Sequence, residues 1–289
     1  MTQLSEMEHH LQQLSDMRNI MNAMKNLAYM EHRKLSRLLL SQQQMISNLE
    51  HVAADYLNFH PYPRHLEASA KNIYLLIGSE RGFCANFNEK LVQAFDEQYQ
   101  PVSDESNTII IVGHKLGKLF ESDSRVADFI DGASFEEEIA SILNSIVSAV
   151  SVLQEQFGTI VLTVLCHTQN SDKNQDGIIS RVLLPPFQSD LESARFTYPP
   201  QLNLPAEQFF SDLSEHYLFA ALYEIAYTSL MIENLWRVQH LEGAVHRLDA
   251  DTETLTKKCR TLRQEEITEE IEVILLSADS MLQPTRYKP

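Results

Sequence analysis

The sequence predicts an α/β protein with long helices: an antiparallel coiled coil of the N- and C-terminal helices, plus a central Rossmann-like α/β domain. Three observations predict this fold class. The C-terminal stretch carries one regular apolar stripe, and the N-terminal stretch carries a similar one. The middle of the chain alternates apolar runs with helical stretches, as mostly parallel sheets do. We therefore expect residues 1–58 and 206–285 to form a coiled-coil shaft, and residues 70–200 to form the α/β domain.

The C-terminal helix is predicted from about Pro205 to Met281, a stretch with no further proline and with one glycine, Gly243. Its apolar residues follow an alternating spacing of three and four, with Thr252 in the one polar slot: Leu241, Val245, Leu248, Leu255, Cys259 and Leu262. Such a stripe must be buried against another helix. A helix of about 75 residues would be about 110 Å long at 1.5 Å per residue, so it needs a partner of similar length.

The partner is predicted at the N-terminus, where residues 3–57 contain neither glycine nor proline. The same spacing continues roughly through Leu4, Met7, Leu11, Leu14, Met17, Met21, Met24, Ala28, Leu35 and Leu38. Two terminal helices with matching stripes most simply pair antiparallel in one left-handed coiled coil. Residues 24–37 mix methionines with basic residues, which fits either a solvated basic face or a surface that binds a partner.

The central domain is predicted from three apolar runs that read as strands buried on both faces: residues 72–77, 107–112 and 159–165. The first two runs are each followed by a glycine and by helical sequence. Residues 135–156 have helical spacing. We expect residues 167–180 to be a loop, and residues 181–205, which contain five prolines, to be irregular.

Composition excludes several classes of protein. The formal net charge of −17 argues against nucleic acid as a partner, because phosphate binding needs a basic face. No run reaches the about 18 apolar residues of a membrane span. We therefore expect a soluble protein. The N-terminus has no apolar segment typical of a signal peptide, so we expect none. The three cysteines, Cys84, Cys166 and Cys259, match no metal spacing and are expected to be buried free thiols.

Three stretches imitate sites of chemistry. GHKLGKL at Gly113–Leu119 resembles a phosphate-binding loop, but it has three residues between its glycines instead of four and lacks the hydroxyl that binds magnesium. Cys84 follows a strand, yet no motif pairs it with a histidine. The acidic run is expected to be a solvated helix face: Glu265, Glu266, Glu269, Glu270 and Glu272. We expect no catalytic site, no cofactor and no metal in this chain.

Three motifs, taken together, identify a family. In the N-terminal helix, Ile20–Ala28 (IMNAMKNLA), followed by His32–Lys34 (HRK), resembles I-T-x-A-M-x-M-V-A-…-R-K. After the first strand, Gly78–Asn88 (GSERGFCANFN) is similar to S-[DE]-R-G-L-C-G-G-x-N. In the last helix, Arg263–Glu270 (RQEEITEE) resembles R-Q-x-x-I-T-x-E. In this order and at these positions, the motifs resemble those of the gamma subunits of F-type ATP synthases over essentially the whole chain.

The resemblance implies a central stalk that couples ion flow through a membrane ring to ATP synthesis or hydrolysis. One copy of the coiled coil would turn inside the α3β3 hexamer of nucleotide-binding subunits, which would hold the catalytic sites. The α/β domain would be the foot, which binds the epsilon subunit and rests on the membrane c-ring. The protein would lie at the cytoplasmic face of the bacterial inner membrane as a peripheral subunit.

The matched motifs also imply roles for single residues. Six residues would face the moving loops of the catalytic subunits: Met24, Lys25, Arg263, Gln264, Thr268 and Glu270. Three would belong to the foot: Arg81, Gly82 and Asn88. Glu233 and Arg237 fit in part the S-E-x-x-A-R-M pattern that precedes the last motif.

The chain also departs from the family pattern. Ala85 and Asn86 replace paired glycines, and Leu235 and Trp236 replace two small residues before Arg237. A tryptophan at that point needs a neighbour of different shape. These replacements leave an alternative, a gamma-like paralogue that does not rotate and acts as a coiled-coil interaction protein.

Overall fold

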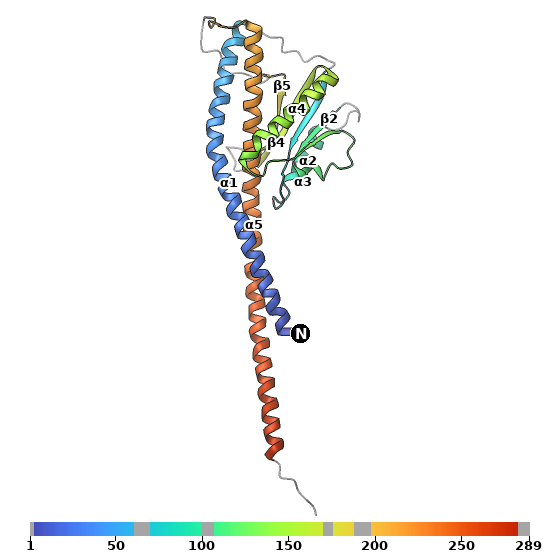
Figure 1. Ribbon diagram of the computed structural model, residues 1–289, viewed down its shortest axis with the longest axis vertical. Coiled ribbons are helices and arrows are strands. Elements are labelled where there is room, and N and C mark those ends of the chain that lie inside the picture. The colour runs from blue at the N-terminus through green and yellow to red at the C-terminus, as the bar shows by residue number, and fades with distance from the viewer. Residues whose placement is uncertain (1–2, 61–69, 100–106, 170–175, 188–197, 283–289) are drawn as a thin grey trace, which may run out of the picture. The chain divides into compact units, whose positions relative to one another are not determined.

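A computed structural model describes residues 3–60, 70–99, 107–169, 176–187 and 198–282. The chain divides into two compact units, a terminal unit of residues 1–26 and 241–289 and a central unit of residues 27–240. Two long helices, α1 (Gln3–Phe59) and α5 (Ala206–Leu282), contribute to both units (Figure 1). The prediction of a long helix at each end of the chain is confirmed.

The terminal unit is an antiparallel pair of helices. Arg18 of α1 forms an ion pair with Asp249 of α5, and Glu8 forms one with Arg263. Partners therefore run backward along α1 while they run forward along α5, which is the antiparallel arrangement. The two helices bury apolar residues of the predicted stripes at Leu14, Leu241, Val245 and Cys259. The coiled-coil prediction is confirmed.

The stripes have two irregular positions. Met17, predicted to lie in the seam, keeps 47% of its surface exposed. Thr252 fills the one polar slot of the α5 stripe, and its hydroxyl oxygen is buried without a hydrogen-bond partner among the described residues. The C-terminal part of α5 extends past the start of α1 (Figure 1).

The described residues of the central unit form one five-stranded sheet, β1 (Lys71–Ile77), β2 (Asn107–Val112), β3 (Val126–Ile130), β4 (Ile160–Gln169) and β5 (Asp176–Leu184). The strand order is β3-β2-β1-β4-β5. β1 pairs in parallel with both β2 and β4, and β2 pairs in parallel with β3. Among the described strands, only β5 is antiparallel, against β4. The predicted Rossmann-like, mostly parallel sheet is confirmed.

Helices cover both faces of this sheet, as the continuous apolar strands require. Alternate residues of β1 point to opposite faces, so Leu75 joins one core and Leu76 joins the other. The first core includes residues of α1, α4 (Ile139–Phe157) and α5. The second includes residues of α2 (Phe87–Gln98) and α3 (His114–Gly117). A short 3-10 helix, η1 (Glu136–Glu138), leads into α4.

The helical pairing continues in the central unit. Gln42 of α1 donates a hydrogen bond to the Ala220 carbonyl of α5 at 3.0 Å. Tyr56 donates to the Ala206 carbonyl at 2.8 Å. Within the described residues, no helix combines the length and the apolar character that crossing a membrane requires. The three cysteines are free and buried, as predicted.

The sequence analysis did not predict two of the strands, β3 and β5. Residues 167–180 were expected to be a loop, but β4 continues to Gln169 and β5 begins at Asp176; residues 170–175 lie outside the described part of the chain. The expected irregular path from residue 181 is also wrong as far as Leu184. Both β3 and β5 are edge strands with several exposed residues, so their sequences mix polar and apolar residues.

Candidate functional site

The carboxyl end of β1 is the point at which a doubly wound sheet usually binds its ligand. The chain builds the sheet outward from β1 to β3 and then crosses to β4 on the other side of β1. Ligands bind such sheets where the strand order reverses, outside the carboxyl ends of the strands. Here the segment Gly78–Asn88 leaves β1 at this point, and Arg237 of α5 contacts it.

The main side chain from α5 is Arg237, which is 6% exposed. Its Nε donates to the main-chain carbonyl of Gly82 at 3.1 Å, and one terminal nitrogen donates to the carbonyl of Arg81 at 3.4 Å. The other terminal nitrogen donates to the Asn234 side chain at 2.8 Å. We call this set of contacts the arginine latch, because one planar guanidinium holds the segment after β1 to the long helix.

Two ionisable neighbours complete the latch. Arg237 forms an ion pair with Glu233, one helical turn earlier on α5, and both side chains are buried. Burial raises the pKa of the Glu233 carboxyl to about 7, against the opposing effect of Arg237. Arg237 also donates to the Cys84 sulfur at 3.1 Å. Burial raises the pKa of the Cys84 thiol to about 12, so this thiol is a weak nucleophile.

The segment Gly78–Asn88 is also tied to the sheet. Asn88 accepts a hydrogen bond from the Ser79 main-chain nitrogen and donates to the Ser79 hydroxyl, both at 2.9 Å. The Glu80 carboxylate accepts from the main-chain nitrogens of His114 at 2.9 Å and Gly132 at 2.7 Å. Because His114 follows β2 and Gly132 follows β3, Glu80 joins the ends of three strands.

Glycine is required at one end of this segment. A Cβ atom on Gly78 would lie 2.4 Å from the Leu116 Cβ atom, a separation that real side chains do not adopt. Ala85, which replaces a family glycine, has a positive φ of 51°, and Phe83 has one of 66°. A left-handed backbone costs about 1–2 kcal/mol for residues other than glycine, so the segment is held in a shape it would not favour alone.

Trp236 finds the neighbours of different shape that its size requires. Its ring makes an edge contact with Phe87 at 5.7 Å and with the buried His167 of β4 at 5.5 Å between centroids. The Lys90 ammonium lies 4.5 Å from the indole centroid. The tryptophan that departs from the family pattern therefore packs from α5 against β4 and the start of α2.

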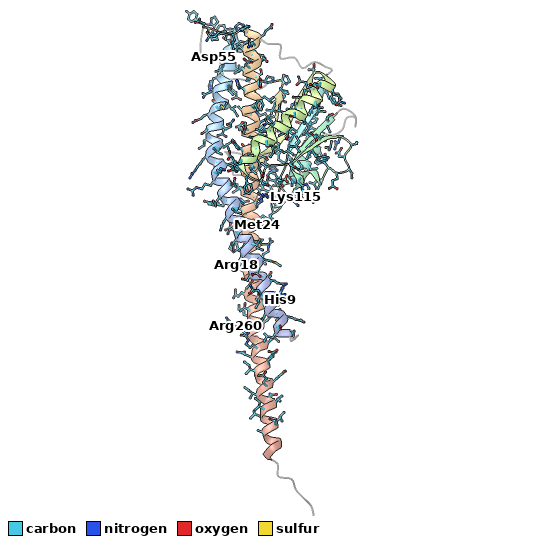
Figure 2. The ribbon with its side chains drawn as sticks, viewed as in Figure 1. His9, Arg18, Met24, Asp55, Lys115 and Arg260 are labelled. Carbon is cyan, nitrogen blue, oxygen red and sulfur yellow. The ribbon has the colours of Figure 1, made fainter. Side chains whose placement is uncertain are left out.

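The residues implied by the resemblance fall into two groups. The foot residues lie in the central unit: Arg81 and Gly82 present their carbonyls to the latch, and Asn88 holds Ser79. The expected partner contacts lie in the terminal unit, where Figure 2 places Met24 on α1. Their role in binding a partner stays a prediction.

Their surroundings are nevertheless clear. Met24 and Lys25 are half-buried, and Arg263 is paired with Glu8. The Thr268 hydroxyl donates to the Gln264 carbonyl at 2.8 Å. The other implied contacts of α5 have exposed side chains, those of Gln264, Thr268 and Glu270.

The latch as a whole was not predicted from the sequence. Glu233 and Arg237 were identified as a partial motif match, but their partners in Gly78–Asn88 were not. One signal was present: the pair has helical i, i+4 spacing inside an apolar stretch of α5, where unpaired charges would be costly. The role of Glu80 had no comparable signal, because main-chain nitrogens cannot be identified as partners from residue types.

Chemically, the guanidinium of Arg237 binds main-chain carbonyls, and acceptors within this chain occupy it. In the described part of the chain, no cluster of histidine, cysteine or carboxylate side chains could hold a metal ion.

Comparison with known proteins gives one consistent result. The family model described as ATP synthase matches residues 3–281. The ATP synthase gamma chain of Clostridium botulinum (strain Langeland) is 24% identical over 217 residues, which are 73% of this chain and 73% of that protein. The gamma chain of Clostridium perfringens (strain SM101) is 22% identical over 286 residues, covering 96% of this chain and 98% of that protein.

The fold agrees with a solved structure. A chain in the OSCP/F1/c-ring structure of the Euglena gracilis mitochondrial ATP synthase, in rotational state 3, matches with a TM-score of 0.60 and 14% identity. The match covers 99% of this chain and 98% of that one. Because the family model spans nearly the whole sequence, this chain belongs to the ATP synthase family, as one of the gamma chains that form the central stalk of the F-type enzyme.

Proposed function

We propose that this chain is the rotor shaft of a two-sector ATP synthase and has no catalytic site of its own. One copy turns inside an α3β3 hexamer, which binds and converts the nucleotides. Its turning couples ion flow through a membrane c-ring to ATP synthesis or hydrolysis. The family match over residues 3–281 supports this assignment, as does the likeness to a chain solved within an OSCP/F1/c-ring assembly.

Exposed apolar side chains at the end of α5 are the main structural support for a surrounding partner. Six large apolar side chains there are 49–70% exposed: Ile267, Ile271, Val273, Ile274, Leu275 and Leu276. An exposed apolar stretch of this length usually marks an interaction site. A ring of subunits that encloses the end of the helix would remove these side chains from water.

A second surface suits an acidic partner. A groove of about 500 Å³ on the central unit is lined by Met30, Arg33, Lys34, Arg37 and Leu38 of α1 together with Glu136. Met30 is 65% exposed, and the side chains of Arg33 and Arg37 are exposed beside it. A partner segment with carboxylates and a few apolar side chains would satisfy both features. This favours a partner surface for the methionine-rich basic stretch of α1.

The proposed torque contacts are Met24, Lys25, Arg263, Gln264, Thr268 and Glu270. A shaft made of two unequal helices has no threefold symmetry. Each orientation therefore offers different contacts to each of three catalytic sites, and favours a different conformation at each one. Differential contacts of this kind shift the populations of the catalytic conformations, and hence their nucleotide affinities.

The remaining assignments follow from the same proposal. Residues 1–58 and 206–285 serve as the shaft and residues 70–200 serve as the foot, which contains Arg81, Gly82 and Asn88. The foot binds the epsilon subunit and rests on the c-ring. The assembled protein lies at the cytoplasmic face of the bacterial inner membrane as a peripheral subunit.

The test is a paired substitution at the proposed torque contacts. Arg263→Ala/Gln264→Ala should impair ATP turnover that is coupled to ion transport in the assembled complex, with helix content unchanged because both side chains are exposed. Arg260→Ala is the matched control, since Arg260 is also exposed on α5 (Figure 2) and lies outside the matched motif. Normal coupling in the double variant would count heavily against the assigned contacts.

A further inference from the structure

We infer that Arg237 is a positioning residue: it holds the segment Gly78–Asn88 against the long helix α5. Through this contact the sheet and α5 transmit torque to each other when the rotor works against a load. The inference rests on the proposed rotor function and assigns a task to a side chain that is turned inward. The arginine latch is the feature that carries it. Arg237 acts through the segment Gly78–Asn88, which it holds, and not through any partner.

The segment Gly78–Asn88 is a junction of the sheet. It continues β1 directly, and the Glu80 carboxylate ties it to the residues that follow β2 and β3 through the nitrogens of His114 and Gly132. A force on the segment is therefore shared by the ends of three strands. A force on the sheet, in turn, reaches α5 where the segment is held.

The arginine latch is stiff. A guanidinium is planar, and its donors point in fixed directions. In Arg237 they are directed at two main-chain carbonyls, the Asn234 side chain and Glu233 of its own helix. The side chain is 6% exposed, so water has little access to exchange with these acceptors. The left-handed backbone of Phe83 shows that the segment is held away from its relaxed shape.

Among the described residues, two other charged side chains link the sheet region to the long helices. Lys34 of α1 reaches Glu136 and Glu137 near the start of α4, but its side chain is 40% exposed. Arg181 of β5 pairs with Glu224 of α5, and its side chain is 27% exposed. Exposed ion pairs such as those of Lys34 contribute about 0–1 kcal/mol and rearrange easily in water. Arg237 is buried more deeply than either, so of these three links it is the one best suited to bear load.

The experiment separates work under load from work without load. The complete complex, carrying Arg237→Met, is reconstituted in vesicles, and ion uptake is measured for each ATP hydrolysed. Hydrolysis by the stalk and hexamer without the membrane sector gives the unloaded rate. We call the ion uptake for each ATP hydrolysed the loaded ratio, and we expect it to fall by about tenfold. A change of this size lies within the range found when a residue that couples two sites is substituted. Unloaded hydrolysis should stay close to that of the unsubstituted complex.

Conservative variants show whether the fork of donors is what matters. Arg237→Lys keeps the charge beside Glu233, but its three donors lack the planar fork that serves two carbonyls, Asn234 and Glu233, so the loaded ratio should be intermediate. Glu233→Gln keeps an acceptor for Arg237 and should remain near the unsubstituted value. Arg125→Met is the matched control, because the Arg125 ion pair joins it to Asp123, only two residues away.

The fluorescence of Trp236, the chain's one tryptophan, reports whether the latch has opened, since this ring adjoins Arg237 on α5. A shifted Trp236 emission with an unchanged loaded ratio would overturn the inference. Equal losses in the loaded and unloaded assays would also overturn it, because loss of a contact that serves to bear load would not slow unloaded hydrolysis. If the unsubstituted chain drives no ion uptake and joins no hexamer, the proposed function itself fails, and the inference falls with it.

Discussion

Removal of the Arg237 guanidinium is expected to be among the most destabilising single changes in the central unit. In Arg237→Met, the Glu233 carboxylate would be left buried at 3% exposure without its ion-pair partner. The carbonyls of Arg81 and Gly82 would lose their donors. Breaking one side of a buried ion pair costs about 3–5 kcal/mol, because the remaining charge is uncompensated.

A double-mutant cycle separates the ion pair from the rest of the latch. Glu233→Gln/Arg237→Met removes both charges and leaves mainly the unsatisfied carbonyls, which cost about 1–3 kcal/mol. The double variant should therefore be more stable than Arg237→Met alone. Additive effects of the two substitutions would refute the ion pair as the source of the cost, because partners in direct contact do not add.

The assay is urea unfolding of the full chain at pH 8, where most Glu233 carboxyls in the folded chain are ionised. Trp236 fluorescence follows the central unit, which contains the latch. Far-UV circular dichroism follows the helices separately, since a chain with two units need not unfold in one step. If Arg237→Met shifts the Trp236 transition by an amount equivalent to less than about 1 kcal/mol, the latch is not a buried ion-pair network.

Four further changes test separate features. The folded-state pKa of Glu233, about 7, lies above its ordinary value of 4.5, so its stabilising effect is full below pH 4.5 and is lost as the pH rises through about 7. Glu233→Gln should remove that decline in urea titrations across this range, and a decline that persists would assign it to another group. Gly243→Ala should raise the melting temperature of the helices, because an added Cβ meets nothing within 4 Å and alanine gains about 0.8–1 kcal/mol in a helix. A lower melting temperature would show that the glycine has a structural role. Thr252→Val should stabilise the terminal unit by about 1 kcal/mol by removing a buried hydroxyl without a partner, whereas Thr254→Val, at an exposed site, should change its melting little. Ala85→Gly should stabilise the central unit by about 0.5–1 kcal/mol, since relief of a positive φ exceeds the entropic cost of glycine; destabilisation in urea would argue against strain at this residue.

The long helices were predictable because their signal is repeated many times. The stripe from Leu241 to Leu262 recurs over several turns, so single irregular positions such as Thr252 do not obscure it. The buried strands β1, β2 and β4 were predictable for a similar reason, since continuous apolar runs indicate burial on both faces. The edge strands β3 and β5 carry no such run, because each is only partly covered.

The latch could not be predicted in full, because its partners are far apart in the sequence. Arg237 meets carbonyls 155 and 156 residues away, and main-chain acceptors leave no mark on residue type. What the sequence did contain was the unusual pairing of Glu233 with Arg237 in an apolar stretch, together with a motif that resembles the family pattern. The resemblance identified both segments, and the structure shows the contact that joins them.

The stoichiometry of the assembly tests the central claim most directly. The chain would be isolated with an affinity tag from cells that express the other subunits, and the intact complexes would be weighed by native mass spectrometry. The proposed function predicts one copy of this chain bound with three copies of each of two nucleotide-binding subunits. Recovery of the chain as a lone monomer, or in a complex without such a ring, would contradict the rotor assignment.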